Sequence, residues 1–108
     1  MPNVQSSRDI IIRTESWRDA VRFYEQVLGF TVSSRAGGTV GFETGCFCLY
    51  VENGAAHGPV LEYLVADVET TRDLLLRAGC TVVEENPSLP RCYLRDPYGV
   101  TFNIGRKL

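Results

Sequence analysis

The feature of this sequence that most limits its fold is an internal repeat. Leu28-Gly29-Phe30-Thr31-Val32 recurs as Ala78-Gly79-Cys80-Thr81-Val82, and each copy follows a helical pattern and precedes three short strand patterns. A β-α-β-β-β unit of this size cannot bury a sheet face alone, so two copies should pair. The repeat predicts an α+β fold with two tandem β-α-β-β-β modules whose curved mixed sheets enclose a cleft. Two unrelated α+β halves are the alternative.

Two segments have the apolar spacing of amphipathic helices, one over residues 17–28 and one over residues 68–78. Ser16 followed by Asp19 resembles a capping box at the start of the first helix. Asp67 is the predicted N-cap of the second helix. The predicted C-terminal stops are Gly29 and Gly79.

Eight short strands are predicted in the rest of the chain. They cover residues 9–13, 30–34, 39–43, 46–52, 60–66, 80–85, 91–95 and 100–105. Residues 53–59 are small and glycine-rich, which predicts a flexible linker that holds the only histidine, His57, in solvent. We therefore expect one domain over residues 1–108, with one module at about 8–53 and the other at about 59–106.

Charge and hydropathy exclude several classes of protein. The 108 residues include 11 basic and 13 acidic side chains, a net charge of −2, without the clustered basic face typical of nucleic-acid binding. The apolar runs are too short to cross a bilayer. The N-terminal residues lack the apolar core of a secretion signal. We expect a cytoplasmic protein with no nucleic-acid or membrane partner.

Four cysteines, Cys46, Cys48, Cys80 and Cys92, need an explanation. Without a secretion signal, a disulfide framework is not expected. Zinc sites made of cysteine usually have two paired clusters, and the Cys46–Cys48 pair stands alone. We expect four buried thiols that behave as small hydrophobic side chains. A reactive or metal-binding cysteine is the alternative.

Two motifs carry a resemblance to a known family. FYEQVLGF (residues 23–30) and DPYGVTF (residues 96–102) resemble the two signatures of the vicinal oxygen chelate superfamily, which includes glyoxalases, bleomycin-resistance proteins and extradiol dioxygenases. With the repeat, the resemblance covers essentially the whole chain. It implies a homodimer and a cleft in which one His or Glu from each of four strands holds a divalent metal that acts as a Lewis acid.

The family's metal-ligand positions can be compared with this sequence one by one. The matching residues are Asp9, Cys48 (or Cys46 or Tyr50 if the register slips), Leu61 and Asn103. Leu61 cannot bind a metal, and the amide of Asn103 is a weak ligand. Glu62 is adjacent, but a shift of one residue points it to the opposite face. We expect no metal site and no cofactor.

Strand alternation predicts which side chains line the cleft. The predicted ligand-binding residues are Asp9, Ile11, Arg13, Cys48, Tyr50, Leu61, Tyr63 and Asn103. This lining is apolar and aromatic with one arginine, which suits an apolar or aromatic organic ligand. Alternatively, these side chains only fill the core. Trp17 similarly belongs either to packing or to a stacking surface for a ligand.

These observations favour a metal-independent, small-molecule-binding protein of the glyoxalase/bleomycin-resistance type. The alternative is a lyase, isomerase or dioxygenase with a non-standard metal site, or with Asp9 as a general base after burial raises its pKa. A salt bridge from Asp9 to Arg13 would oppose that role. A third possibility is a dimerisation module without a ligand. The sequence is thus compatible with an enzyme as well as with a binding protein.

Overall fold

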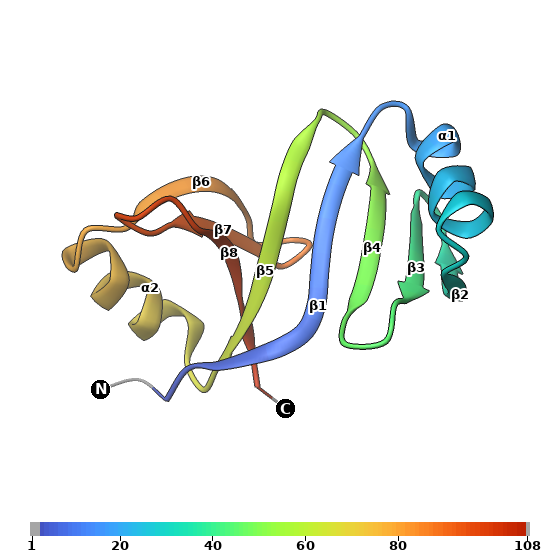
Figure 1. Cartoon of the computed structure of the whole chain (residues 1–108). Helices are drawn as coiled ribbons and strands as arrows, with labels where there is room; N and C mark the ends of the chain where they lie inside the picture. The colour runs from blue at the N-terminus through green and yellow to red at the C-terminus, as the bar shows by residue number, and fades with distance from the viewer. Residues whose placement is uncertain (1–2, 108) are drawn as a thin grey trace. The chain divides into compact units, whose positions relative to one another are not determined.

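The computed structural model describes residues 3–107, which form eight strands and two helical segments (Figure 1). Their order is β1 (Gln5–Thr14), α1 (Trp17–Arg22) continued by the π-helical turn η1 (Phe23–Val27), β2 (Thr31–Ala36), β3 (Thr39–Glu43), β4 (Cys48–Asn53), β5 (His57–Val65), α2 (Val68–Arg77), β6 (Thr81–Asn86), β7 (Arg91–Arg95) and β8 (Thr101–Arg106). The chain divides into two compact units. We call Arg8–Pro59 the first module and residues 60–107 with 3–7 the second. The predicted α+β fold of two β-α-β-β-β modules is confirmed.

The first module is a sheet of strand order β2-β3-β4-β1, in which β1 and β4 run parallel and the other pairs are antiparallel. The helix α1–η1 covers one face (Figure 1). The core under it consists of Val40, Phe42, Leu49 and Val51. Trp17 packs against this core, and its indole Nε1 donates a hydrogen bond to the Val51 carbonyl oxygen at 2.9 Å. The structure therefore favours the packing role for Trp17.

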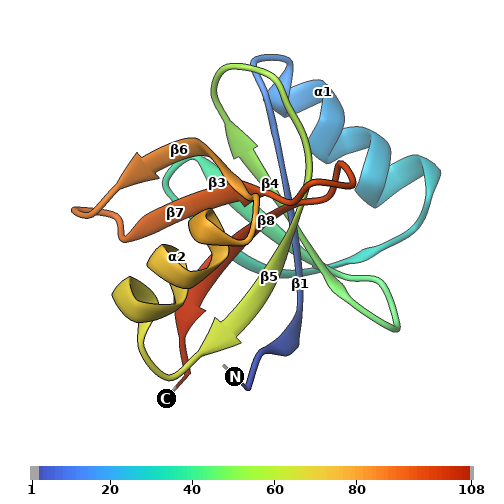
Figure 2. The same ribbon diagram turned by 90° about the vertical axis from the view of Figure 1, so that its left-hand side faces the viewer.

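The second module repeats this plan with the order β5-β8-β7-β6, again with one parallel pair, β5 and β8. Helix α2 lies across one face of the sheet, in front of β7 and β8 in Figure 2. The buried core is made of Val65, Cys80, Cys92, Leu94, Phe102 and Ile104. Among the described residues, no helix is long and apolar enough to cross a membrane.

The repeat extends to the irregularities of the two sheets. A β-bulge interrupts the β2–β3 pairing between Val32 and Ser34, and another interrupts the β6–β7 pairing between Val82 and Glu84. Each bulge lies at the same place after the recurring Gly-x-Thr-Val segment. Because a bulge increases the twist of its strand, the outer strand of each module is twisted at the same point.

The helix ends confirm some of the local predictions. Gly29 and Gly79 follow the helices with φ of 74° and 109°, a conformation that side chains with a Cβ rarely adopt. Asp67 caps α2 by accepting a hydrogen bond from the Thr70 amide at 3.0 Å. The predicted capping box is wrong, because the Ser16 side chain makes no capping hydrogen bond.

The predicted flexible linker is also wrong. Asn53 ends β4, and His57 already begins β5, so only residues 54–56 connect the two strands. The Gly54 amide donates to the Thr14 carbonyl oxygen at 3.3 Å, which holds the start of this connection to the end of β1. His57 is half-buried instead of solvated, and its Nδ1 lies 3.0 Å from the Gly58 carbonyl oxygen.

Truncation of Phe42 tests the core of the first module. Its side chain is fully buried, so Phe42→Ala should lower the free energy of unfolding by about 3–5 kcal/mol through lost apolar contact and a new cavity. Urea denaturation followed by Trp17 fluorescence measures the change. The control Val27→Ala, at a residue 69% exposed, should change stability by less than about 0.5 kcal/mol. Equal effects of the two substitutions would contradict the burial of Phe42 in this core.

Candidate functional site

Each sheet has one face covered by its helix and one helix-free face, and the helix-free faces carry the polar groups. In the first module, Ile10, Ile12, Leu49 and Val51 belong to the helix-covered core. Strand alternation then puts the intervening side chains on the helix-free face. These are five of the predicted ligand-binding residues: Asp9, Ile11, Arg13, Cys48 and Tyr50.

The face predicted for Leu61 and Tyr63 is wrong. Both pack against the core under α2, and the Tyr63 ring lies 4.7 Å from the Phe102 ring, centroid to centroid. The register between β5 and β8 pairs Glu62, not Leu61, with Asn103. The sequence misleads here because β5 is apolar on both faces, as strands in parallel pairs often are, and its alternation is therefore weak.

A hydrogen-bonded chain runs across the helix-free face of the second module. The Cys92 amide donates to Asn103 Oδ1 at 2.8 Å, and Asn103 Nδ2 donates to Glu62 Oε2 at 2.9 Å. The amide of Asn103 is only 8% exposed, so the Cys92 N–H fixes which way it points. Within residues 3–107, Glu62 Oε1 receives no hydrogen bond, which leaves it available to a ligand.

Arg91 and Tyr93 lie on the same face as the hydrogen bonds between Cys92, Asn103 and Glu62, because Tyr93 pairs with Asn103 and with Glu84. The Arg91 guanidinium lies 2.8 Å from a Glu84 carboxylate oxygen and 5.1 Å from the centre of the Tyr93 ring. Such a cation over an aromatic face is a favourable contact. Sequence reasoning missed Arg91, although the alternation of Arg91 and Tyr93 with the apolar Cys92 and Leu94 could have shown the shared face.

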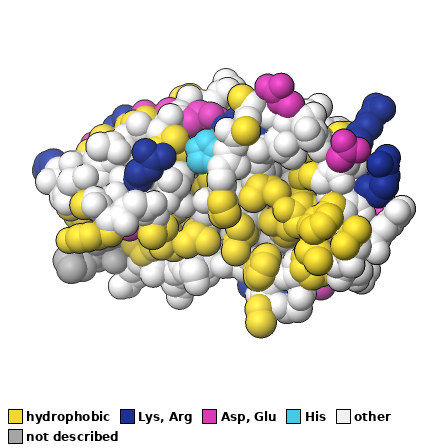
Figure 3. Space-filling view, turned by 45° about the horizontal axis from the view of Figure 1, so that its top comes forward, with side chains coloured by type: hydrophobic (Ala, Val, Ile, Leu, Met, Phe, Trp, Pro, Cys, Tyr) yellow, Lys and Arg dark blue, Asp and Glu magenta, His cyan; other side chains and the backbone are white. Residues whose placement is uncertain are grey.

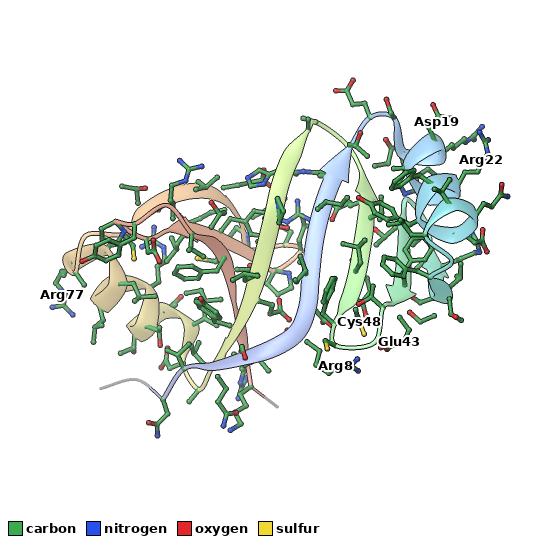
Figure 4. The ribbon with its side chains drawn as sticks, viewed as in Figure 1. Arg8, Asp19, Arg22, Glu43, Cys48 and Arg77 are labelled. Atoms are coloured by element: carbon green, nitrogen blue, oxygen red, sulfur yellow. The ribbon has the colours of Figure 1, made fainter. Side chains whose placement is uncertain are left out.

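In the first module, Arg8 and Glu43 organise the loop between β3 and β4 (Figure 4). Arg8 Nη2 lies 2.6 Å from Glu43 Oε1 and donates to the Gly45 carbonyl oxygen at 3.0 Å. Its Nε donates to the Cys46 carbonyl oxygen at 3.2 Å. The thiol of Cys48 donates to Glu43 Oε2 at 3.5 Å. Glu43 is thus shared between a guanidinium and a thiol.

The pKa values of these groups follow from their contacts. The hydrogen bond from Arg8 lowers the pKa of the Glu43 carboxyl. Burial raises the pKa of the Cys48 thiol, and the Glu43 carboxylate raises it further. Cys48 is therefore a protonated donor at neutral pH. Burial also raises the pKa of Asp9, and the Arg8 charge opposes that shift.

The expectation of four buried thiols is only half right. Cys80 and Cys92 are buried, whereas Cys48 is half-buried and Cys46 is exposed in the loop between β3 and β4. The reason is that Phe47, not either neighbouring cysteine, turns toward the core under α1.

The donor set does not suit the divalent metal that the family resemblance implies. Within residues 3–107, no three His, Cys, Asp or Glu side chains cluster in a way that could hold a metal ion. The amide oxygen of Asn103, its only metal-binding atom, already accepts the Cys92 N–H. The Cys48 thiol keeps its proton and donates to Glu43, although thiolate is the form that binds metals.

A protein-family model matches most of the chain. The model of the glyoxalase-like domain matches residues 9–105. The match covers most of the sequence, and the chain therefore belongs to the glyoxalase-like family. A search of the curated proteins found no match.

Solved structures show the same fold at low sequence identity. A glyoxalase/bleomycin resistance protein/dioxygenase superfamily member from Vibrio splendidus 12B01 has a TM-score of 0.65 at 14% identity, covering 99% of this chain and 100% of that chain. A hypothetical protein from Bacillus halodurans C-125 has 0.68 at 14%, with 98% and 96% covered. Homoprotocatechuate 2,3-dioxygenase from Brevibacterium fuscum has 0.67 at 15%, with 98% of this chain but 37% of that chain covered.

The contact between Cys48 and Glu43 can be tested by alkylation. Glu43→Gln removes a negative charge that raises the pKa of Cys48, so the pH profile of its alkylation should move to lower pH. Iodoacetamide labelling of Cys48, followed by peptide mass spectrometry in a Cys46→Ser background, measures this. Glu25→Gln, on η1, is the matched control and should leave the profile in place. An unchanged profile in Glu43→Gln would mean that the thiol does not donate to Glu43 in solution.

Proposed function

We propose that this protein binds a small organic molecule without a metal, on the helix-free face that carries Glu62 and Asn103. The observation that supports this is the chain from the Cys92 amide through Asn103 to Glu62, which orients one carboxylate and leaves its second oxygen to accept a hydrogen bond. A site of this kind favours a ligand with a hydroxyl or amino donor.

The surroundings of Glu62 suit an aromatic body on that ligand. On the same face the Tyr93 ring is only 4% exposed and lies under the Arg91 guanidinium, so this planar guanidinium is the group on which an aromatic ring would stack. The ligand class is therefore an aromatic molecule with a polar donor.

An enzyme is the second candidate, and Asp9 supports it. Burial raises the pKa of this carboxyl, which brings it closer to the range in which a general base works at neutral pH. The reaction class would be that of a lyase or isomerase that moves a proton. The dioxygenase similarity adds ring cleavage as a further class, which would need a metal site of a different kind from the one that the family resemblance implies.

We further propose that the chain works as a cytoplasmic homodimer. The core of the first module has four buried residues, yet nine partly buried hydrophobic side chains pack around them and stay partly open to solvent. Figure 3 shows hydrophobic side chains gathered over the half of the molecule that holds this module. Apolar side chains that stay partly exposed favour a protein partner, and a second copy would cover them.

Binding of 3,4-dihydroxyphenylacetate tests the proposed site, because this ligand combines an aromatic ring with neighbouring hydroxyl donors. Calorimetric titration should give saturable binding that excess EDTA does not change. Glu62→Gln should weaken it about tenfold or more, the effect of losing a hydrogen bond to a charged group. Glu15→Gln, at an exposed residue outside both faces, should leave the affinity unchanged.

The other outcomes separate the alternatives. Loss of binding in EDTA would replace the proposal with a metal-dependent site. Consumption of the compound, abolished in Asp9→Asn, would support the enzyme. Equal affinity in Glu62→Gln and the unsubstituted protein would remove Glu62 from the site.

A further inference from the structure

The second module has a cavity of about 540 Å³ on its helix-covered side, between the first half of α2 and the hairpin that joins β6 to β7. We call it the α2 cavity. It lies against the face of Cys92 and Ile104, which is opposite to the face of Glu62 and Asn103. Neither the family resemblance nor the proposed function uses this space. Its volume falls within the range of small-molecule sites.

The base and one wall of the α2 cavity are apolar and rigid. Cys92 and Ile104 are buried core residues, and Val68 of α2 packs against the same core. Pro87 and Pro90 line the cavity from the hairpin. Proline rings have fixed backbone φ angles, so this wall does not have to be ordered when a ligand binds.

An ion pair fixes the opposite wall. Arg72 donates from Nε to Glu85 Oε2 at 2.6 Å and from Nη2 to Glu85 Oε1 at 2.7 Å. The Cys92 thiol donates to the same carboxylate at 3.8 Å. The guanidinium of Arg72 lowers the pKa of the Glu85 carboxyl, so the pair stays charged at neutral pH. The plane of the guanidinium is therefore held in place, and a fixed guanidinium is a good stacking surface for an aromatic ring.

The charges of the cavity do not favour an ion. Three acidic residues and three basic residues line it: Glu69, Asp73, Glu85, Arg72, Arg91 and Arg106. The Arg91 guanidinium is turned to the opposite face, where it is paired with Glu84, and Arg72 is shared between Glu85 and Asp73. Glu69 and Arg106 add one further charge of each sign. A charged ligand would thus gain no excess of opposite charge, while an uncharged ring gains apolar contact and stacking.

We propose that the α2 cavity is a second ligand site, which binds an uncharged planar aromatic ring against the Arg72 guanidinium, Val68 and Ile104. This site is independent of the proposed function, because it lies on the other face of the sheet.

Titration with indole tests the proposal, since indole is planar, aromatic and uncharged. In ¹⁵N-labelled full-length protein, saturable shifts are expected at the backbone amides of Val68, Arg72, Glu85 and Cys92. Val68→Phe should fill the cavity and weaken indole binding about tenfold or more, the loss expected for one stacked aromatic contact. Thr70→Phe places the same ring on an exposed position of α2 that does not line the cavity, and it should bind indole as the unsubstituted protein does.

A second variant tests the stacking surface itself. The double substitution Arg72→Leu with Glu85→Leu removes both charges of the ion pair together, so neither is left in the cavity without the other. Asp73 also loses its contact with Arg72, but its side chain is 68% exposed and stays solvated by water. Loss of about tenfold in affinity, with an unchanged amide spectrum elsewhere, supports the proposal. Affinity that is unchanged in both the double variant and Val68→Phe would overturn it. Shifts confined to the face of Glu62, or no saturable shifts up to the solubility of indole, would also overturn it.

Discussion

The parallel pairing of the first and last strand of each module decides what the rest of the molecule can do. In the first module this pairing sets Asp9 opposite Cys48, and in the second it sets Glu62 opposite Asn103. A shift of one residue in either pair would exchange the helix-covered and helix-free faces of that strand. The apolar residues that α1 and α2 cover fix the register, and the polar groups of the opposite face follow from it. Packing on one face thereby determines chemistry on the other.

The two modules have the same architecture but carry different chemistry. Ile11 lies as far before the start of α1 as Glu62 lies before the start of α2. Ile11 is paired with Tyr50 in the first module, as Glu62 is paired with Asn103 in the second. One module thus offers a carboxylate and an amide where the other offers an aliphatic and an aromatic side chain. The repeated backbone supplies the positions, and the substitutions at those positions separate a polar role from an apolar one. Family membership is consistent with this division, since one fold serves several chemistries.

The sequence was sufficient for the repeat, for all eight strands and for the C-terminal ends of both helices, because strong periodicity and the glycines at positions 29 and 79 are local signals. It was insufficient for β5, where Val60, Leu64 and their neighbours make both faces apolar and conceal the alternation. The Arg8–Glu43 pair and the Arg72–Glu85 pair join residues 35 and 13 positions apart, respectively, and no local pattern predicts such contacts. The state of Cys48 depends on Glu43 in the same way. The register of β5 and these ion pairs depend on contacts between distant parts of the sequence, so only the folded structure shows them.

The matching bulges in β2 and β6 have a consequence for how copies of the chain meet one another. These strands are the outer strands of their modules, and an outer strand with unpaired backbone groups is a template on which further chains can add without limit. A bulge breaks the regular row of donors and acceptors and twists the strand away from a flat neighbour. Growth by strand addition is therefore disfavoured at the same point of each module. The repeated module therefore carries the same safeguard against fibre formation in both of its copies.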